Sequence, residues 1–138
     1  MPRHESLSAP AAGRRRLLLW VPPVLWMAII FALSAQSALP SLGVNLSDKL
    51  EHAITYAILG VLLLRAIAGG TPAGASLARA ALAVGLAACY GLSDEAHQVF
   101  VPGRHFDWLD LAADTAGAAA GAGALWAWGI IRRHWTRP

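Results

Sequence analysis

Charge is scarce in this sequence of 138 residues: charged residues make up only 14% of it, whereas hydrophobic residues make up 57%. An average soluble domain has about 25% charged residues. A disordered chain needs high charge and low hydrophobicity, so this composition excludes one. It also disfavours a soluble domain, because so short a chain has a large surface that polar residues must cover. The composition therefore predicts a membrane protein.

Several other features are missing. Cys89 is the only cysteine, so the chain cannot form an internal disulfide. The sequence contains no P-loop, no GxGxxG, no HExxH and no CxxC. The net charge is +3, but no basic stripe or RNA-binding aromatic motif accompanies it. We therefore expect no nucleic-acid partner and no cofactor, and we assign no metal from sequence motifs.

What the sequence does contain is long apolar segments. Residues 17–47 carry no charge and no histidine over 31 positions, and about 20 such residues span a bilayer. The predicted spans are Leu17–Ala35, about Leu50–Ala68, about Leu77–Leu92 and about Leu111–Ile131. Spanning segments of this length must be helical, because lipid cannot satisfy backbone polar groups. We predict an all-α, four-helix transmembrane bundle over residues 17–131. A cleaved signal peptide in the first segment is the alternative.

The charges predict an orientation. Four spans place both termini on one side, with a flexible basic tail at residues 1–16 and a second basic tail at 132–138. Nine of the 11 cations fall on that side, and only Lys49 and Arg104 on the other. Seven of the eight acids fall on the side of Lys49 and Arg104. The positive-inside rule therefore predicts cytoplasmic termini and a multi-pass protein of the cytoplasmic (inner) membrane.

Polar residues gather at the predicted outer boundary. Asp48, His52 and Tyr56 are spaced i, i+4, i+8 on one helical face, which Lys49 can join. Ser47 is placed to cap the start of this helix. Two further groups follow: Asp94, Glu95 and Gln98 at the end of the third span, then Arg104, Asp107, Asp110 and Asp114 leading into the fourth. Ionisable residues within or at the edge of a membrane span are costly, so they indicate a functional site by default.

Other interpretations of these groups stay open. The acids could form a structural ion-pair network, in which Arg104 makes a bidentate bond to Asp110. A metal site at His52 is conceivable without a supporting motif, and we expect His97 and His105 to be solvated loop residues. Gly117 and Gly121 form a GxxxG that permits close helix packing, either within the chain, which we expect, or against a second copy.

These groups also carry a family resemblance. The segments SDKLEHAITYAILG and GLSDEAHQVFVPGRHFDWLDLAADTAGAAAG, with FALSAQS before them, resemble the VanZ-like family of small bacterial membrane proteins over about residues 20–125. The matching positions are Asp48, Lys49, His52 and Tyr56 (DKxxHxxxY), Asp94, Glu95 and Gln98 (DExxQ), Val101–Arg104 (VPGR), and Asp110, Asp114 and Gly117. Position 114 is often Asn in the family, whereas this chain has Asp.

The resemblance implies a topology and a site, but no reaction. The family is named for a protein that confers low-level resistance to teicoplanin, a glycopeptide that binds cell-wall precursors outside the membrane. Our main hypothesis is a lipid-embedded protein whose outer polar site binds an envelope or glycopeptide-related ligand. The alternatives are an enzyme acting on a lipid-linked envelope substrate and a scaffolding protein. The sequence leaves open the ligand, the reaction, the oligomeric state and whether the first span is cleaved.

Overall fold

The computed structural model describes residues 9–37 and 47–135. Every regular element in these two ranges is helical, which confirms the predicted all-α class. The elements are α1 (Ala9–Leu18), α2 (Val21–Ser34), α3 (Asp48–Ile67), the short 3-10 helix η1 (Pro72–Gly74), α4 (Leu77–Gln98) and α5 (Trp108–Trp135).

The helix boundaries follow from local chemistry. Pro22 and Pro23 occupy the first turn of α2, where their missing N–H groups cost nothing, and the chain breaks between α1 and α2 just before them. As expected, the Ser47 hydroxyl caps α3 by accepting a bond from the Leu50 amide, and Ser76 caps α4 in the same way. Helices α2, α3 and α4 therefore each begin at a residue that satisfies or removes free amide groups.

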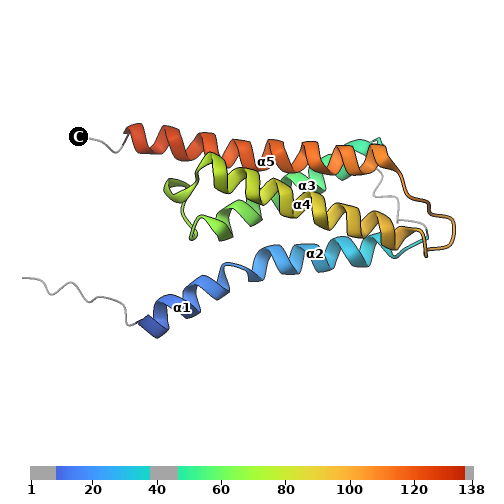
Figure 1. The fold of residues 1–138 in the computed structure, drawn as a ribbon, viewed down its shortest axis with the longest axis horizontal. Coiled ribbons are helices and arrows are strands. Elements are labelled where there is room, and N and C mark those ends of the chain that lie inside the picture. The colour runs from blue at the N-terminus through green and yellow to red at the C-terminus, as the bar shows by residue number, and fades with distance from the viewer. Residues whose placement is uncertain (1–8, 38–46, 136–138) are drawn as a thin grey trace, which may run out of the picture.

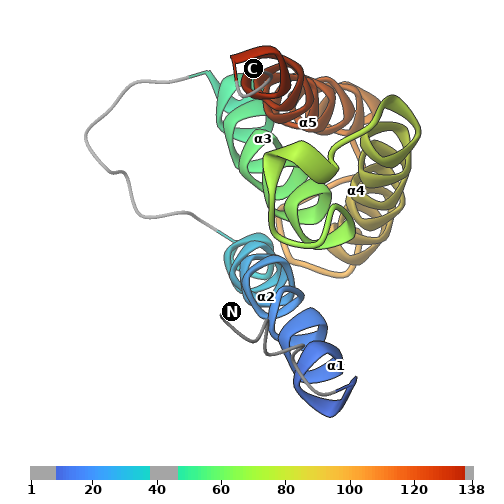
Figure 2. The ribbon, with the colours of Figure 1, turned by 90° about the vertical axis from the view of Figure 1, so that its left-hand side faces the viewer.

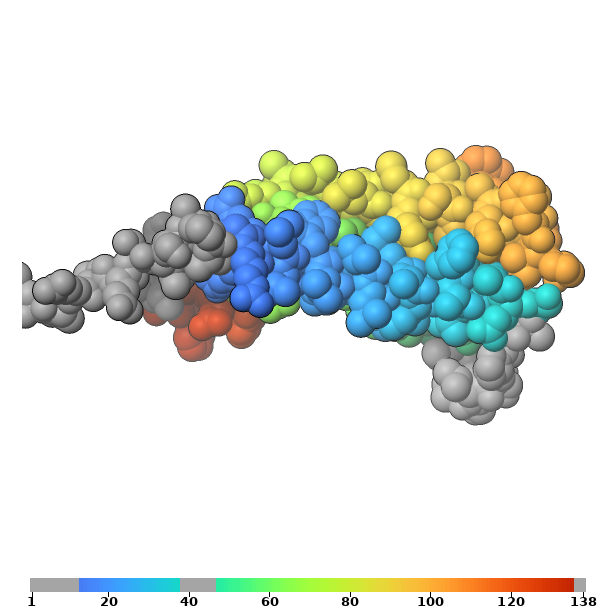
Figure 3. Space-filling view, turned by 90° about the horizontal axis from the view of Figure 1, so that it is seen from below, coloured from blue at the N-terminus to red at the C-terminus, as the bar shows by residue number. Residues whose placement is uncertain are grey.

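The helices run alternately up and down. Figure 1 shows α1 and the end of α5 at one end of the molecule, and the ends of α2 and α4 and the start of α5 at the other. Viewed along the axis, α3, α4 and α5 form a three-helix core, with α2 at its edge and α1 pointing away (Figure 2). Figure 3 shows α1 and α2 extending along the length of the molecule. Because α3 and α5 run in the same direction, their first turns meet at one end.

Small residues hold α3 and α5 together. A Cβ added at Gly117 would collide with the carbonyl oxygen of Ala53, and one at Gly121 with the carbonyl oxygen of Ala57. Gly60 on α3 meets the backbone of Ala118 on α5 in the same manner. We call these six residues, Ala53, Ala57, Gly60, Gly117, Ala118 and Gly121, the glycine seam. The GxxxG motif thus packs within the chain, as expected.

Three segments are long and apolar enough to cross a membrane: Gly13–Ser34, Asp48–Ile67 and Leu77–Gln98. The surface of the molecule also suits a lipid environment, since large apolar side chains such as Val24, Leu25 and Phe31 are exposed. Four acidic side chains, those of Asp94, Glu95, Asp110 and Asp114, are buried instead, with Glu95 fully enclosed. This arrangement, with apolar side chains outside and polar side chains inside, is typical of a membrane protein.

Helix α5 is not among these three segments. Its sequence is rich in Ala and Gly and includes Asp110 and Asp114, which lower its hydropathy. Its 28 residues correspond to about 42 Å of helix, which exceeds the thickness of about 30 Å of a hydrocarbon core. A fourth span over α5 therefore remains a prediction from its length and from the alternating directions of the helices.

The two predicted tails overlap helices. Helix α1 covers Ala9–Leu18 and so includes half of the expected N-terminal tail, because its Ala, Arg and Leu residues are strong helix formers. Helix α5 continues to Trp135 and includes the start of the expected C-terminal tail. The remaining tail residues, 1–8 and 136–138, lie outside the described residues.

Three hydrogen bonds between elements attach α2 to the core. The Trp26 indole donates to the carbonyl oxygen of Thr55 on α3 at 3.0 Å, and the Tyr90 hydroxyl of α4 donates to the carbonyl oxygen of Met27 at 2.6 Å. Near the end of α2, the Ser34 hydroxyl donates to the Asp94 carboxylate at 2.6 Å. In lipid, where no water competes, polar bonds of this kind contribute to holding a helix at the edge of a bundle.

Candidate functional site

Buried polar side chains gather at one end of the bundle, where the last turns of α2 and α4 meet the first turns of α3 and α5. Among the described residues, the buried polar or charged side chains are Ser34, Asp94, Glu95, Gln98, Asp110 and Asp114. They come from three different helices that are separated in sequence. The fold therefore brings the scattered polar groups of the sequence into one acidic end.

The outer part of this end is an ion-pair layer around Lys49. The Lys49 ammonium lies 2.6 Å from the Asp107 carboxylate and also forms an ion pair with Asp110. Asp48 is a looser partner at 3.7 Å. Lys49 thereby connects the first turn of α3 to the start of α5. We call Asp48, Lys49, Asp107 and Asp110 the lysine layer.

Asp107 links this layer to α4. Its backbone N–H donates to Glu95 Oε2 at 2.9 Å, and its own carboxylate accepts from the Leu109 amide at 2.8 Å. The pKa of the Asp107 carboxyl is held below its usual value, because both of its hydrogen bonds favour the charged carboxylate. The bond from the Lys49 ammonium has the larger effect, and the bond from the Leu109 amide has the smaller one. The start of α5 is therefore fixed to both α3 and α4 through this one residue.

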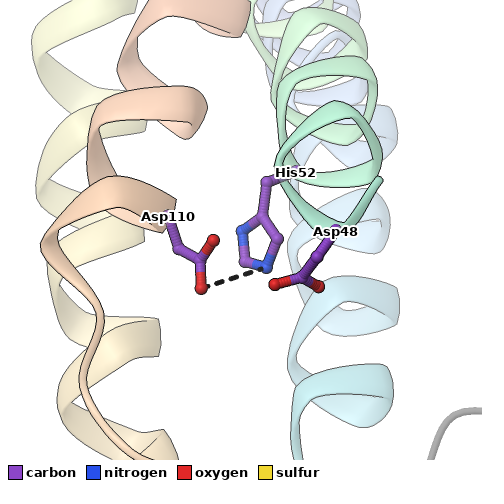
Figure 4. Close-up of side chains that lie close together, drawn as sticks. All are labelled: Asp48, His52 and Asp110. Atoms are coloured by element: carbon purple, nitrogen blue, oxygen red, sulfur yellow. Dashed lines mark ion pairs between the residues drawn. The ribbon is translucent and has the colours of Figure 1, made fainter. Parts of the chain in front are cut away.

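Below the lysine layer, His52 lies between two carboxylates of α5. Its Nδ1 is 2.9 Å from Asp114 Oδ1, and its Nε2 is 3.9 Å from Asp110 Oδ2. Figure 4 shows Asp48 and His52 on α3 facing Asp110 across the gap to α5. Each ring nitrogen thus faces an oxygen, and the pair of carboxylates fixes the orientation of the imidazole.

Glu95 and Asp114 complete a deeper group with His52. Glu95 is 0% exposed and Asp114 is 1% exposed. Glu95 Oε2 accepts the Asp107 amide, but Oε1 has no hydrogen-bond partner among the described residues. One nitrogen of His52 and one oxygen each of Glu95 and Asp114 lie within 4.8 Å of one another. We call these three residues the inner triad.

Tyr56 borders the inner triad from α3. Its side chain is buried, and its hydroxyl has no hydrogen-bond partner among the described residues. Its ring and the Asp114 carboxylate both lie beside Gly91 on α4, within 3.3 Å of the position a Cβ would take there. Because Gly91 has no side chain, α4 leaves room at this point for the ring and the carboxylate.

With this geometry established, comparison with known proteins identifies the family. A family model described as VanZ/LLP1 matches residues 18–131. The chain belongs to the VanZ/LLP1 family. No curated protein and no solved structure gives a significant match.

The motifs that carried the VanZ resemblance converge in space. Asp48, Lys49, His52 and Tyr56 lie on α3, Asp94, Glu95 and Gln98 end α4, and Asp110 and Asp114 begin α5. Nine of the predicted site residues therefore meet at the acidic end. Spacing along each helix predicted which residues share a face, and the alternating directions of the helices bring those faces together.

Arg104 is the exception, and the bidentate bond to Asp110 that one interpretation of the sequence allowed is not formed. Arg104 forms no ion pair with any carboxylate of the described residues, and its buried Nε has no hydrogen-bond partner there. Asp110 pairs with Lys49 instead. The reason is the parallel course of α3 and α5, which places Lys49 directly beside the first turn of α5.

Two residues of the site were missed by sequence reasoning. Ser34 binds Asp94 and brings the end of α2 into the site, and Tyr90 connects α4 to the backbone of α2. The only sequence signal for Ser34 was its place in the FALSAQS segment that resembles the VanZ family. His97 also differs from expectation, since its ring packs against Phe31 with centroids 4.4 Å apart and its Nε2 is buried.

Proposed function

We propose that this VanZ/LLP1 family member is a multi-pass protein of the cytoplasmic membrane whose acidic end binds a cationic envelope ligand, and that it thereby contributes to glycopeptide resistance or envelope maintenance. One observation carries the proposal. Four carboxyl groups, those of Asp94, Glu95, Asp110 and Asp114, are buried, and among the described residues only two of them form ion pairs. Asp110 pairs with Lys49 and His52, and Asp114 pairs with His52.

Charge balance supports a cationic ligand. Carboxylates are costly to bury without compensating positive charge, and like charges repel most strongly where water is excluded. Lys49 also serves the half-exposed Asp107, which leaves even less positive charge for the buried groups. A cation that enters from the outer surface would remove this imbalance.

The position of the charges supports an outward-facing site. The described arginines Arg14–Arg16 lie at the opposite end of the molecule from the acidic cluster, as does the basic last turn of α5. The positive-inside rule assigns such a basic end to the cytoplasm. The acidic end would then meet envelope components at the outer surface.

Glycopeptide susceptibility tests this function. In a strain where deleting the gene changes teicoplanin susceptibility, Glu95→Gln and Asp114→Asn should reproduce the deletion phenotype at normal protein levels. Glu51→Gln is the matched control, because Glu51 is an exposed acid on α3. Wild-type teicoplanin susceptibility in both site variants would contradict the proposal.

A second candidate function is catalysis on a lipid-linked envelope substrate. The observation in its favour is the 2.9 Å pair between His52 and Asp114 near Glu95, whose Oε1 has no hydrogen-bond partner among the described residues. An imidazole oriented by a carboxylate is suited to acid or base catalysis, with Glu95 as the second proton-transferring group. Full retention of biological activity by Glu95→Gln at wild-type protein levels would contradict the acid–base role.

A further inference from the structure

We infer that the inner triad of His52, Glu95 and Asp114 binds a divalent first-row transition metal ion such as Zn²⁺ or Mn²⁺. The inference rests on the proposed function in one respect, which is that the acidic end is a binding site. It goes further by naming a metal ion as the deepest ligand of that site.

The donor set suits such an ion. One imidazole nitrogen and two carboxylate oxygens, from three different helices, lie within 4.8 Å of one another. Imidazole and carboxylate bind Zn²⁺ and Mn²⁺ at about 2.0–2.2 Å, so two ligands of one ion are at most about 4.4 Å apart. The 2.9 Å between His52 Nδ1 and Asp114 Oδ1 already fits adjacent ligands. A small rotation of the Glu95 side chain would complete the set.

The unpartnered oxygen of Glu95 is the independent observation that points to a ligand. A fully buried carboxylate oxygen without a hydrogen-bond donor is costly, because it has lost water and gained nothing. The other oxygen is held by the Asp107 amide, which fixes the carboxylate beside His52 and Asp114. A metal ion would supply the positive partner that Oε1 lacks.

The surrounding residues form the support that metal ligands usually have. When Nδ1 of His52 binds the ion, Nε2–H faces the Asp110 carboxylate at 3.9 Å, so that a carboxylate orients the metal-bound imidazole. The Asp107 amide orients Glu95 in the same way. The exposed Asp48 offers a carboxylate oxygen within 4.8 Å of a ring nitrogen of His52, where it attracts cations from solution.

A second donor set exists nearer the surface and shares one ligand with the first. It consists of Asp48, His52 and Asp110 (Figure 4). Lys49 pairs with both of these aspartates, so positive charge already lies on the surface set. The inner triad has no lysine or arginine partner among the described residues. We therefore assign the ion to the inner triad.

Metal content of the purified full chain in detergent tests the assignment. The protein is stripped with a chelator, dialysed against Zn²⁺ or Mn²⁺, and its bound metal is measured by elemental analysis. Wild type should retain about one ion per chain, held by the three protein ligands with water at the remaining open position. His52→Ala, Glu95→Gln and Asp114→Asn should retain almost none, whereas the exposed-acid control Glu51→Gln should match wild type.

Two further measurements keep the test decisive. Asp48→Asn should retain the ion, and its loss there would assign the metal to the surface set instead. Glu95→Gln is the critical ligand variant, since its amide oxygen still accepts the Asp107 N–H and the fold is preserved. A chelator should lower the melting temperature of wild type but not that of Glu95→Gln. Equal metal content in wild type and Glu95→Gln, or none in either, would overturn the inference.

The metal inference and the proposed function can fail separately. If wild type binds no metal but Glu95→Gln changes teicoplanin susceptibility, the metal assignment is wrong and the proposed function stands. If Glu95→Gln loses the ion but susceptibility stays at the wild-type value, the metal site stands and the resistance role is wrong.

Discussion

The contact between α3 and α5 has two halves of opposite chemistry. Toward the acidic end, the two helices meet through charged side chains, from Lys49 and His52 on one helix to Asp110 and Asp114 on the other. Farther along, they meet through the glycine seam, where backbone approaches backbone. The same stripe of α5 supplies both halves, since Asp114 is followed on that face by Gly117 and Gly121.

The difference teaches how an acidic cluster can be held in place. The seam depends on dispersion contacts and on the absence of Cβ atoms, and neither responds to pH or ions. The charged half adds directional bonds but also repulsion among its carboxylates. We interpret the seam as the part that fixes the helices and the charged half as the part that binds.

The largest effect should come from breaking the seam. Gly117→Leu would drive a side chain into the backbone of Ala53, so the helices must separate. We expect a loss of about 3 kcal/mol or more in the free energy of unfolding, measured by thermal denaturation in detergent. Gly123→Leu is the control, because a Cβ there meets nothing within 4 Å. Equal melting temperatures for the two variants would show that the seam does not hold the fold.

A smaller loss should follow from removing the hydroxyl of Ser34. Ser34→Ala removes the hydroxyl that donates to the buried Asp94 carboxylate at 2.6 Å. Such a loss costs about 1–3 kcal/mol, and α2 should become more open to proteolysis. The control is Ser93→Ala, since the exposed Ser93 bonds only to its own helix at Tyr90. Identical protease resistance would contradict a role for Ser34 in attaching α2.

Neutralising the lysine layer should cost less again. Lys49→Met removes the cation shared by Asp107 and Asp110, and partly exposed ion pairs contribute about 1 kcal/mol or less. Arg104→Met is the matched comparison, because Arg104 has no ion pair among the described residues. Chemical denaturation should show a loss for Lys49→Met alone. A larger loss of unfolding free energy for Arg104→Met than for Lys49→Met would contradict the conclusion that Lys49 is the cation that pairs with these aspartates.

The smallest effect should be a pH dependence from Asp107. Its pKa is lower in the folded protein than in the unfolded chain, because Lys49 favours the charged carboxylate. The folded state therefore gains stability from this group above its unfolded pKa of about 3.9. That gain is lost as the pH falls through the folded pKa. The free energy of unfolding is therefore measured as a function of pH, and Asp107→Asn should lose less stability on acidification than wild type. An unchanged pH dependence would contradict the pairing of Asp107 with Lys49.

Much of the fold was predictable because membrane helices are specified locally. Long apolar segments predicted the helices, and Ser47 predicted the start of α3. The face shared by Asp48, His52 and Tyr56 also followed from helical spacing alone. These features depend on residues a few positions apart, which a sequence displays directly.

Contacts between helices were not predictable to the same degree. Lys49 lies in the first turn of α3, and Arg104 lies between α4 and α5. Both are at the acidic end, and only the register of α3 against α5 decides that Asp110 pairs with Lys49. Ser34 lies in a long uncharged segment where nothing marks it as a partner of Asp94, 60 residues away. Pairings between residues of different helices depend on three-dimensional packing, and a single sequence does not give the distances between those helices.

The hydrogen bonds of α2 have a consequence for how the molecule can move. Trp26 and Ser34 are eight residues apart, or about 12 Å along the helix axis, and each is bonded to a different helix of the core. Sliding α2 by one helical turn, about 5.4 Å, would break both bonds at once, together with the bond from Tyr90 to Met27. Tilting α2 outward about the level of Trp26 would break only one of these three bonds, that of Ser34 to Asp94, together with the ring contact between Phe31 and His97. The easiest motion is therefore a lateral opening toward lipid, with the depth of α2 in the bilayer unchanged.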